Sequence, residues 1–228
     1  MRVRRGVVLC YHAVSADWSH RLALPPAQLL RQVRTARRLC GHVHVTFDDA
    51  YRSILDVVPE LLRQAVPVSV FVCTDFADRG GAPLDVPELA PADERDLAGL
   101  ATLSWDELRN LASHGVEIGS HTVTHPHLPG LGDDELAQEL RDSKRRIETE
   151  LGEPCRRLAY PYGEHDLRVR SAAREAGYEE AFALRAASGD RFALPRVDLY
   201  RRDTALRAAL KTSVLHRPMT AGIESLSR

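Results

Sequence analysis

The stretch Val43-His44-Val45-Thr46-Phe47-Asp48-Asp49-Ala50-Tyr51 decides the fold of this chain. Apolar side chains alternate up to Phe47, which predicts a β-strand, and two adjacent carboxylates follow where that strand ends. If the backbone turns there, Asp48 and Asp49 can face one cleft, where one carboxylate pairs with a cation and the other accepts a proton. The alternative is that Asp49 caps a following helix, expected over 53–64, because Asp is a favoured N-cap residue.

The composition of the chain is that of an ordinary globular protein. Its 228 residues are 44% hydrophobic and 28% charged, which suits a single domain over 1–228 with a sizeable core. The net charge of -1 provides no electrostatic footprint for nucleic acid. No apolar run approaches the ~20 residues of a membrane span. The run after Arg5 is too short for a signal peptide, and the four cysteines are dispersed, so we expect a cytoplasmic protein.

Strand and helix patterns alternate about seven times along the chain. This order predicts parallel βα units, and hence an α/β fold of about seven parallel strands. One helix is expected to begin after Pro25, with Leu29, Leu30, Val33 and Leu39 as its apolar positions. Strands are expected at 6–12, 43–49, 66–72, 116–120, 157–160, 181–183 and 195–199, and the other helices at 53–64, 104–113, 133–151, 167–176 and 203–214.

Several polar residues fall where these expected strands end. They are His12, Asp48, Asp49, His121 and Tyr162. Parallel barrels and open α/β sheets carry their sites at the carboxyl ends of their strands. We therefore expect these side chains to share one site.

Three histidines occur within seven residues, in the segment Ser120-His121-Thr122-Val123-Thr124-His125-Pro126-His127. A helical turn would bring His121 and His125 to one side, about 5–6 Å apart, although Pro126 requires that turn to be short or irregular. Two neutral imidazoles and an Asp are a ligand set for one divalent cation with positions left for water. Taken alone, the pair could belong to an ordinary polar loop. The neighbouring Asp-Asp pair favours a metal site.

Three segments resemble the first three motifs of the polysaccharide deacetylases, also called the NodB-homology family or carbohydrate esterase family 4. They are Thr46-Phe47-Asp48-Asp49-Ala50, Ser120-His121-Thr122-Val123-Thr124-His125-Pro126 and Tyr160-Pro161-Tyr162-Gly163, in the family's order. Leu9-Cys10-Tyr11-His12 resembles the start of one subgroup. The resemblance covers most of the chain. It implies a distorted (β/α) barrel that removes N-acetyl groups from an amino sugar or N-acetylated glycan with one divalent metal, zinc being the first expectation.

Carried over by position, the resemblance implies that Asp49, His121 and His125 bind the metal and that Asp48 is the general base. A bound cation lowers the pKa of its water and polarises a carbonyl, and a nearby carboxylate can take the proton. The amide N–H of Tyr162 is the expected oxyanion donor in the third motif, because the preceding proline has no N–H.

The sequence departs from the family pattern at three places. Ala50 stands where the family usually has glycine, which is tolerable unless that residue needs a positive φ. Ala159 replaces the arginine that often tethers the base; Arg196 could take over this role, or be an ordinary surface or structural arginine. The family's late general acid has no clear match, and His216 is better explained as structural. His12 could bind substrate or be a buried, hydrogen-bonded histidine.

Two other functions fit part of this pattern. One is a two-His-one-carboxylate iron oxygenase, and the other is a non-catalytic carbohydrate-binding relative with the same fold. Substrate choice is expected to depend on Asp75–Leu103, a long segment without clear periodicity that follows the third strand. It could form a wall or lid whose acidic groups favour hydroxyl-rich or cationic substrates, or be a solvated excursion.

Overall fold

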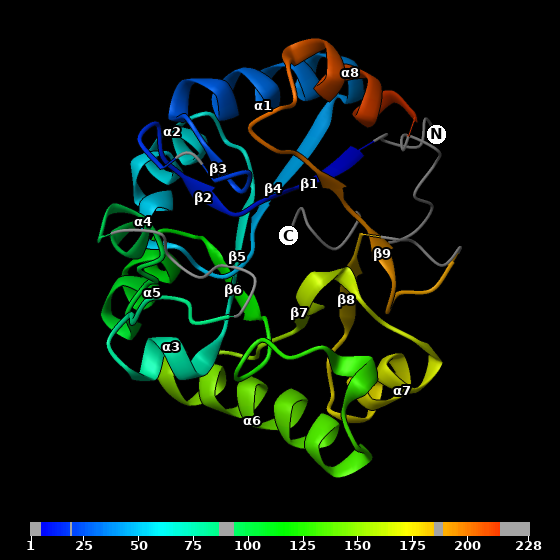
Figure 1. Cartoon of the computed structure of the whole chain (residues 1–228). Helices are drawn as coiled ribbons and strands as arrows, with labels where there is room; N and C mark the ends of the chain where they lie inside the picture. The colour runs from blue at the N-terminus through cyan, green and yellow to red at the C-terminus, as the bar shows by residue number, and fades with distance from the viewer. Residues whose placement is uncertain (1–5, 19, 87–93, 185–188, 215–228) are drawn as a thin grey trace.

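A curved parallel sheet is the centre of the fold (Figure 1). The computed structural model describes residues 6–18, 20–86, 94–184 and 189–214. Eight parallel strands follow the order β10-β1-β4-β5-β6-β7-β8-β9, which confirms the expected α/β fold and distorted barrel. These strands are β1 Gly6–Tyr11, β4 His42–Phe47, β5 Val68–Val72, β6 Glu117–Ser120, β7 Arg157–Ala159, β8 Glu180–Ala183, β9 Leu194–Pro195 and β10 Val197–Asp198.

One short segment nearly closes the barrel. β9 pairs with β8 and β10 pairs with β1, and only Arg196 separates the two strands. The segment 194–198 therefore joins both edges of the sheet, and it corresponds to the seventh strand expected from the sequence. At this junction Arg196 is fully buried, with its guanidinium close to the rings of both Phe71 and Phe182.

Helices cover the outside of the barrel (Figure 1). Ser104 and Glu107 form the capping box that starts α5, as predicted. No described helix is long and apolar enough to cross a membrane. The helices are α1 Pro26–Cys40, α2 Val58–Arg63, α3 Thr74–Asp78, α4 Glu94–Gly99, α5 Trp105–Ser113, α6 Asp133–Leu151, α7 Leu167–Glu175 and α8 Ala205–Val214, with 3₁₀ turns η1 Arg52–Asp56, η3 Leu128–Gly130 and η4 Pro161–Gly163.

Two helix predictions were wrong in detail. The helix expected over 53–64 is split into η1 and α2, because Pro59 lies at the start of α2 and cannot continue a preceding helix. Leu39 is 53% exposed, although it was expected among the apolar positions of α1. The buried stripe of α1 runs through Leu29, Val33, Ala36 and Cys40, and Leu39 lies one residue away from it, on a different face.

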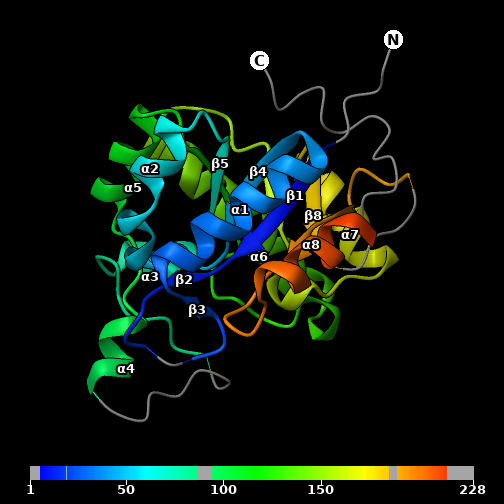
Figure 2. The same cartoon turned by 90° about the horizontal axis from the view of Figure 1, so that it is seen from above.

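The described parts of the insertion at 75–103 contain more regular structure than its composition suggested. They contain α3 and α4, and they pack beside a small parallel pair, β2 Ala13–Val14 with β3 Ala23–Leu24 (Figure 2). Leu84 and Leu100 are buried in one cluster with Trp18, so this part of the insertion is not a solvated excursion. The residues 87–93 lie outside the described part of the chain.

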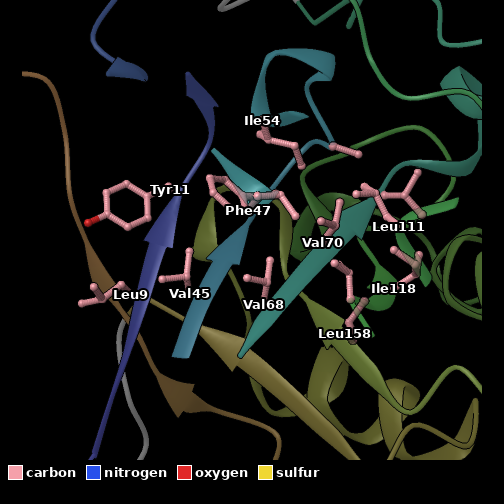
Figure 3. Close-up of a cluster of buried hydrophobic side chains, with 14 of the residues drawn as sticks. Leu9, Tyr11, Val45, Phe47, Ile54, Val68, Val70, Leu111, Ile118 and Leu158 are labelled. Carbon is pink, nitrogen blue, oxygen red and sulfur yellow. The ribbon is translucent and has the colours of Figure 1, made fainter. Parts of the chain in front are cut away.

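The two faces of each strand have different surroundings. Val45, Phe47 and Val70 point outward into the main core under the helices (Figure 3). Inside the barrel, Phe71 and Phe182 form an apolar layer with an edge-to-face contact, 5.6 Å between ring centroids. Because side chains alternate along a strand, the residues next to the outward set, including Thr46, point into the barrel.

Gly119 of β6 is required by this interior packing. A Cβ atom there would lie 2.5 Å from the Phe71 ring and 2.9 Å from the carbonyl oxygen of Arg157. We expect Gly119→Ala to lower the free energy of unfolding by about 2 kcal/mol or more, because the clash includes rigid backbone. Urea unfolding measures this loss. Gly130→Ala is the matched control, since its Cβ would meet nothing within 4 Å; equal stability of the two variants would contradict the packing argument.

Candidate metal centre

Backbone strain is concentrated at the carboxyl ends of the strands. Six described non-glycine residues have a positive φ, and all but Ala65 belong to this end of the barrel. Such conformations cost energy and persist where the surrounding structure enforces them, often at functional sites. The five residues are Asp49, Ala50, Thr122, His125 and Tyr162.

The turn after β4 brings the two carboxylates to the same site. Asp49 has φ 66 and Ala50 has φ 52, so the strand alternation ends at Phe47 and both Asp48 and Asp49 line one pocket. The helix-cap alternative for Asp49 is wrong, because η1 follows Tyr51 and no side chain caps it. Ala50 does need the positive φ that a glycine would supply, at a cost of about 1–2 kcal/mol for a residue with a Cβ atom.

Asp49, His121 and His125 converge on one point. The Oδ1 atom of Asp49 lies 3.5 Å from Nε2 of His121 and 3.3 Å from Nε2 of His125, and all three side chains are buried. Ligand atoms bound at ~2.0–2.1 Å to one tetrahedral cation are separated by about 3.3–3.4 Å. The spacing therefore fits three ligands of a single divalent cation with a further position left open.

The protonation states of these groups also fit a cation. Nδ1 of His121 lies 2.7 Å from the carbonyl oxygen of Ala159, so Nδ1 carries the proton and Nε2 presents its lone pair. Burial lowers the pKa of His121 to about 4, against the opposing charge of Asp48, so the ring is neutral near pH 7. Oδ1 of Asp49 is buried and accepts no hydrogen bond from the part of the chain that the structure describes. A cation at this point would satisfy it.

The second histidine is held by a strained loop rather than by the helical turn that the spacing suggested. Thr122 has φ 74 and His125 has φ 64, and the hydroxyl of Thr122 accepts a hydrogen bond from the His125 N–H at 3.1 Å. Glu139 of α6 accepts from the N–H groups of Val123 and Thr124, at 2.7 and 3.1 Å. Sequence reasoning missed Glu139, since nothing local to α6 relates it to this loop.

Asp48 is held by Arg196. Nη1 of Arg196 donates to Oδ1 of Asp48 at 2.6 Å and Nη2 donates to Oδ2 at 2.7 Å, and both side chains are buried. Burial alone would raise the pKa of Asp48, but the charge and hydrogen bonds of Arg196, together with the neighbouring His121 and His12, outweigh burial and hold the pKa well below its usual range. Asp48 is therefore an ionised carboxylate beside the three converging ligands. Of the two alternatives for Arg196, the structure shows contact with Asp48 rather than a surface position.

One lone pair of Asp48 stays available. The thiol of Cys10, at 3.4 Å, also donates to Oδ2, so Oδ2 has two donors and Oδ1 has one. A carboxylate oxygen can accept two hydrogen bonds. Among the described contacts, Oδ1 is thus the oxygen with room for a further proton donor.

A second group, Cys10, His12 and Asp48, also has its ligand atoms within 4.8 Å of one another. A cation there would lie against the guanidinium of Arg196, which already occupies both oxygens of Asp48. Burial also raises the pKa of the Cys10 thiol, which opposes the thiolate that a metal requires. The charges therefore favour the Asp49 group as the metal centre.

The site opens into a pocket of about 180 Å³. His12 and Tyr162 line it, as expected, and the Tyr162 ring lies between His125 and His127, with centroids 4.6 and 3.9 Å away. From the insertion, the apolar Val86 lines the pocket while Asp85 is exposed and absent from its lining, which gives no support to an acidic wall in this described part. His216 lies outside the described residues. The lining also includes Gly163 of the third motif, and four residues that the sequence did not indicate: Arg21, Leu22, Leu184 and Tyr200.

Comparison with known proteins identifies the family. The family model described as polysaccharide deacetylase matches residues 35–181, which is more than half of the chain. The chain belongs to the polysaccharide deacetylase family. The matched region includes Asp48, Asp49, His121, His125 and Tyr162, while Arg196 lies beyond it.

The individual curated relatives share only low sequence identity with this chain. It is 26% identical to YxkH of Bacillus subtilis, named for the same family, over 68% of this chain and 50% of that protein. It is also 26% identical to a chitooligosaccharide deacetylase of Sinorhizobium fredii, over 59% of this chain and 53% of that protein. The chain thus spans about half the length of the curated relatives that it matches.

Two solved structures have the same fold as this deacetylase-family chain. The Streptococcus pyogenes deacetylase PplD in complex with acetate has a TM-score of 0.72 at 19% identity, covering 90% of this chain and 97% of the other. IcaB from Ammonifex degensii has a TM-score of 0.71 at 24% identity, covering 92% and 97%. These likenesses support the barrel fold alone.

Proposed function

We propose that the chain is a metal-dependent hydrolase that removes the N-acetyl group from an amino sugar or an N-acetylated glycan or glycoconjugate. The observation that carries this proposal is the pairing of two units in one pocket: three converging ligands with an unsatisfied Asp49 oxygen, and an ionised Asp48 held by Arg196. Either unit alone could serve only to bind a ligand or to stabilise the fold. Together they are what hydrolysis of an amide requires.

Each residue of the site has its own role in the proposed hydrolysis. Asp49, His121 and His125 would hold a divalent cation, with zinc favoured by the imidazole and carboxylate donors. That cation supplies Lewis acidity, which lowers the pKa of a water and polarises a carbonyl. Asp48 accepts the proton of the attacking water at Oδ1, the oxygen with a free lone pair. Tyr162 is proposed to donate its N–H to the developing oxyanion, and His12, on the pocket wall, to contact the sugar.

The pocket lining combines the apolar side chains of Leu22 and Val86 with polar groups that include Asp48 and Asp49. This combination suits a sugar ring that carries an acetamido group pointing toward Asp48 and Asp49. A non-catalytic carbohydrate-binding role would not require an ionised base beside the ligand set. That role is therefore the weaker proposal.

Metal content and acetate release test the proposal together. We expect the purified protein to bind one divalent ion per chain and, once loaded, to release acetate from short N-acetylated oligosaccharides. His121→Ala and His125→Ala should each lose most of the metal and most of the activity, because each removes one of three ligands. Mass spectrometry of the metal and an acetate assay measure both effects.

His114→Ala is the matched control, since His114 is exposed at the end of α5, away from the pocket lining. It should leave metal content and activity unchanged. A protein that binds no divalent metal under any loading condition would refute the metal centre. A loaded protein that consumes oxygen with an oxoacid, and releases no acetate, would indicate the iron oxygenase instead.

A further inference from the structure

The guanidinium of Arg196 has few anchors apart from Asp48. Its Nη1 and Nη2 atoms donate to the two oxygens of Asp48, and its buried Nε has no hydrogen-bond partner among the described residues. A further hydrogen bond runs from Nη1 to the hydroxyl oxygen of Thr46, at 3.1 Å. The guanidinium carbon also lies 5.5 and 5.7 Å from the ring centroids of Phe71 and Phe182, which accept no hydrogen bond from it.

Thr46 is itself fixed to the barrel wall. It lies on β4, two residues before Asp48, and is fully buried. Its hydroxyl donates to the carbonyl oxygen of Leu9 on β1 at 2.9 Å, which orients its lone pairs toward the barrel interior where Arg196 lies. The contact to Arg196 therefore links the guanidinium to the β1–β4 ladder.

The two hydrogen bonds between Arg196 and Asp48 do not by themselves fix the position of this ion pair inside the barrel. Two hydrogen bonds to the same carboxylate keep Arg196 and Asp48 aligned with each other, yet the pair can still tilt as a unit. A third bond from Nη1 to a fixed point on the wall removes that freedom. Catalytic groups need such support, because small misplacements cost large factors in rate.

We propose that Thr46 is a positioning residue for the general base: its hydroxyl anchors Nη1 of Arg196 to the barrel wall and so holds Oδ1 of Asp48 in line with the water that it deprotonates. The proposal rests on the proposed function, since it concerns the base of that reaction. Thr46 touches neither substrate nor metal in this assignment. It acts through Arg196.

The test compares substitutions that separate the hydroxyl from the shape of the side chain. Thr46→Val keeps the shape and loses both hydrogen bonds, whereas Thr46→Ser keeps the hydroxyl and loses a methyl group. We expect Thr46→Val to lower kcat about tenfold or more, which corresponds to about 1.4 kcal/mol, with KM and metal content near those of the wild type. Thr46→Ser should stay within about threefold. A packing role would give the opposite order, with valine active and serine impaired, and that result would overturn the proposal.

A matched control and a substitute variant support the comparison of Thr46→Val with Thr46→Ser. Thr212→Val is a matched change at another fully buried threonine, whose hydroxyl donates to carbonyl oxygens within α8, and it should leave kcat unchanged. If Thr46→Val does not fold, Thr46→Ala takes its place. Ala and Ser both lack the methyl group and differ only in the hydroxyl, so kcat should again fall with Ala and persist with Ser.

A second measurement does not depend on activity. In metal-free protein labelled with ¹⁵N-arginine, NMR detects the guanidinium protons of Arg196 and their rotation about the Cζ–Nη1 bond. Thr46→Val should accelerate that rotation and broaden the Nη1 signal, while Thr46→Ser should preserve it. An unchanged signal in Thr46→Val would refute the anchor. Absence of acetate release by the wild type, with this NMR difference intact, would refute the proposed function and leave the anchor standing.

Discussion

Arg196→Met is expected to lower the free energy of unfolding by about 3–5 kcal/mol, because it leaves the buried carboxylate of Asp48 without its charged partner. Asp48 and Arg196 are both almost completely inaccessible to solvent, and no other described group forms an ion pair with Asp48. Denaturant unfolding of metal-free protein at neutral pH measures the loss. Arg156→Met is the control: Arg156 is half exposed in its pair with Glu179, and such surface pairs contribute less than about 1 kcal/mol.

The pH dependence of Arg196→Met provides a second readout with a definite sign. In the wild type, Arg196 holds the pKa of Asp48 below its unfolded value, so the stability from this pair is present at neutral pH and is lost as pH falls through the lowered pKa. Without Arg196, burial dominates and raises the pKa of Asp48. The variant should then gain stability on acidification from pH 7 toward pH 4, relative to the wild type. A parallel decline of both proteins over that range would contradict this account.

Asp48→Asn is expected to lower kcat by about 10²–10⁴-fold, because an amide cannot accept the proton of the attacking water. Metal content should be unchanged, since Asp48 belongs to the Arg196 pair and not to the three converging ligands. The assays are acetate release and metal analysis, with circular dichroism to verify folding, because Asn leaves the charge of Arg196 unbalanced. Asp142→Asn, on the surface of α6, is the control.

Asp49→Asn completes the comparison between the two adjacent carboxylates. We expect it to reduce metal binding, since Asp49 provides the only carboxylate oxygen at the point where His121 and His125 converge among the described residues. If Asp48→Asn lost its metal while Asp49→Asn kept it, the two roles would have to be exchanged.

Local sequence was sufficient for the strands of the barrel, for most of the helices and for the face that carries the site, but it missed the short strands β2 and β3 and the helices α3 and α4. Alternation predicted β4 through Phe47, and a capping box predicted the start of α5, because these signals depend on neighbouring residues alone. The placement of polar residues at strand ends predicted a shared site, because parallel strands direct their carboxyl ends to one edge. Local pattern failed where a helix was interrupted by Pro59 and where Leu39 turned out to face solvent.

The tertiary structure decided between the alternatives that the sequence left open for Arg196 and for Asp49. Arg196 is 148 residues away from Asp48 in the chain, and it reaches that carboxylate because the segment 194–198 closes the barrel between β8 and β1. The left-handed turn at Asp49 and Ala50 brings two carboxylates together that strand alternation alone would have separated. Neither feature has a local signal: ion pairing across the barrel depends on closure, and a strained turn persists only because surrounding packing enforces it.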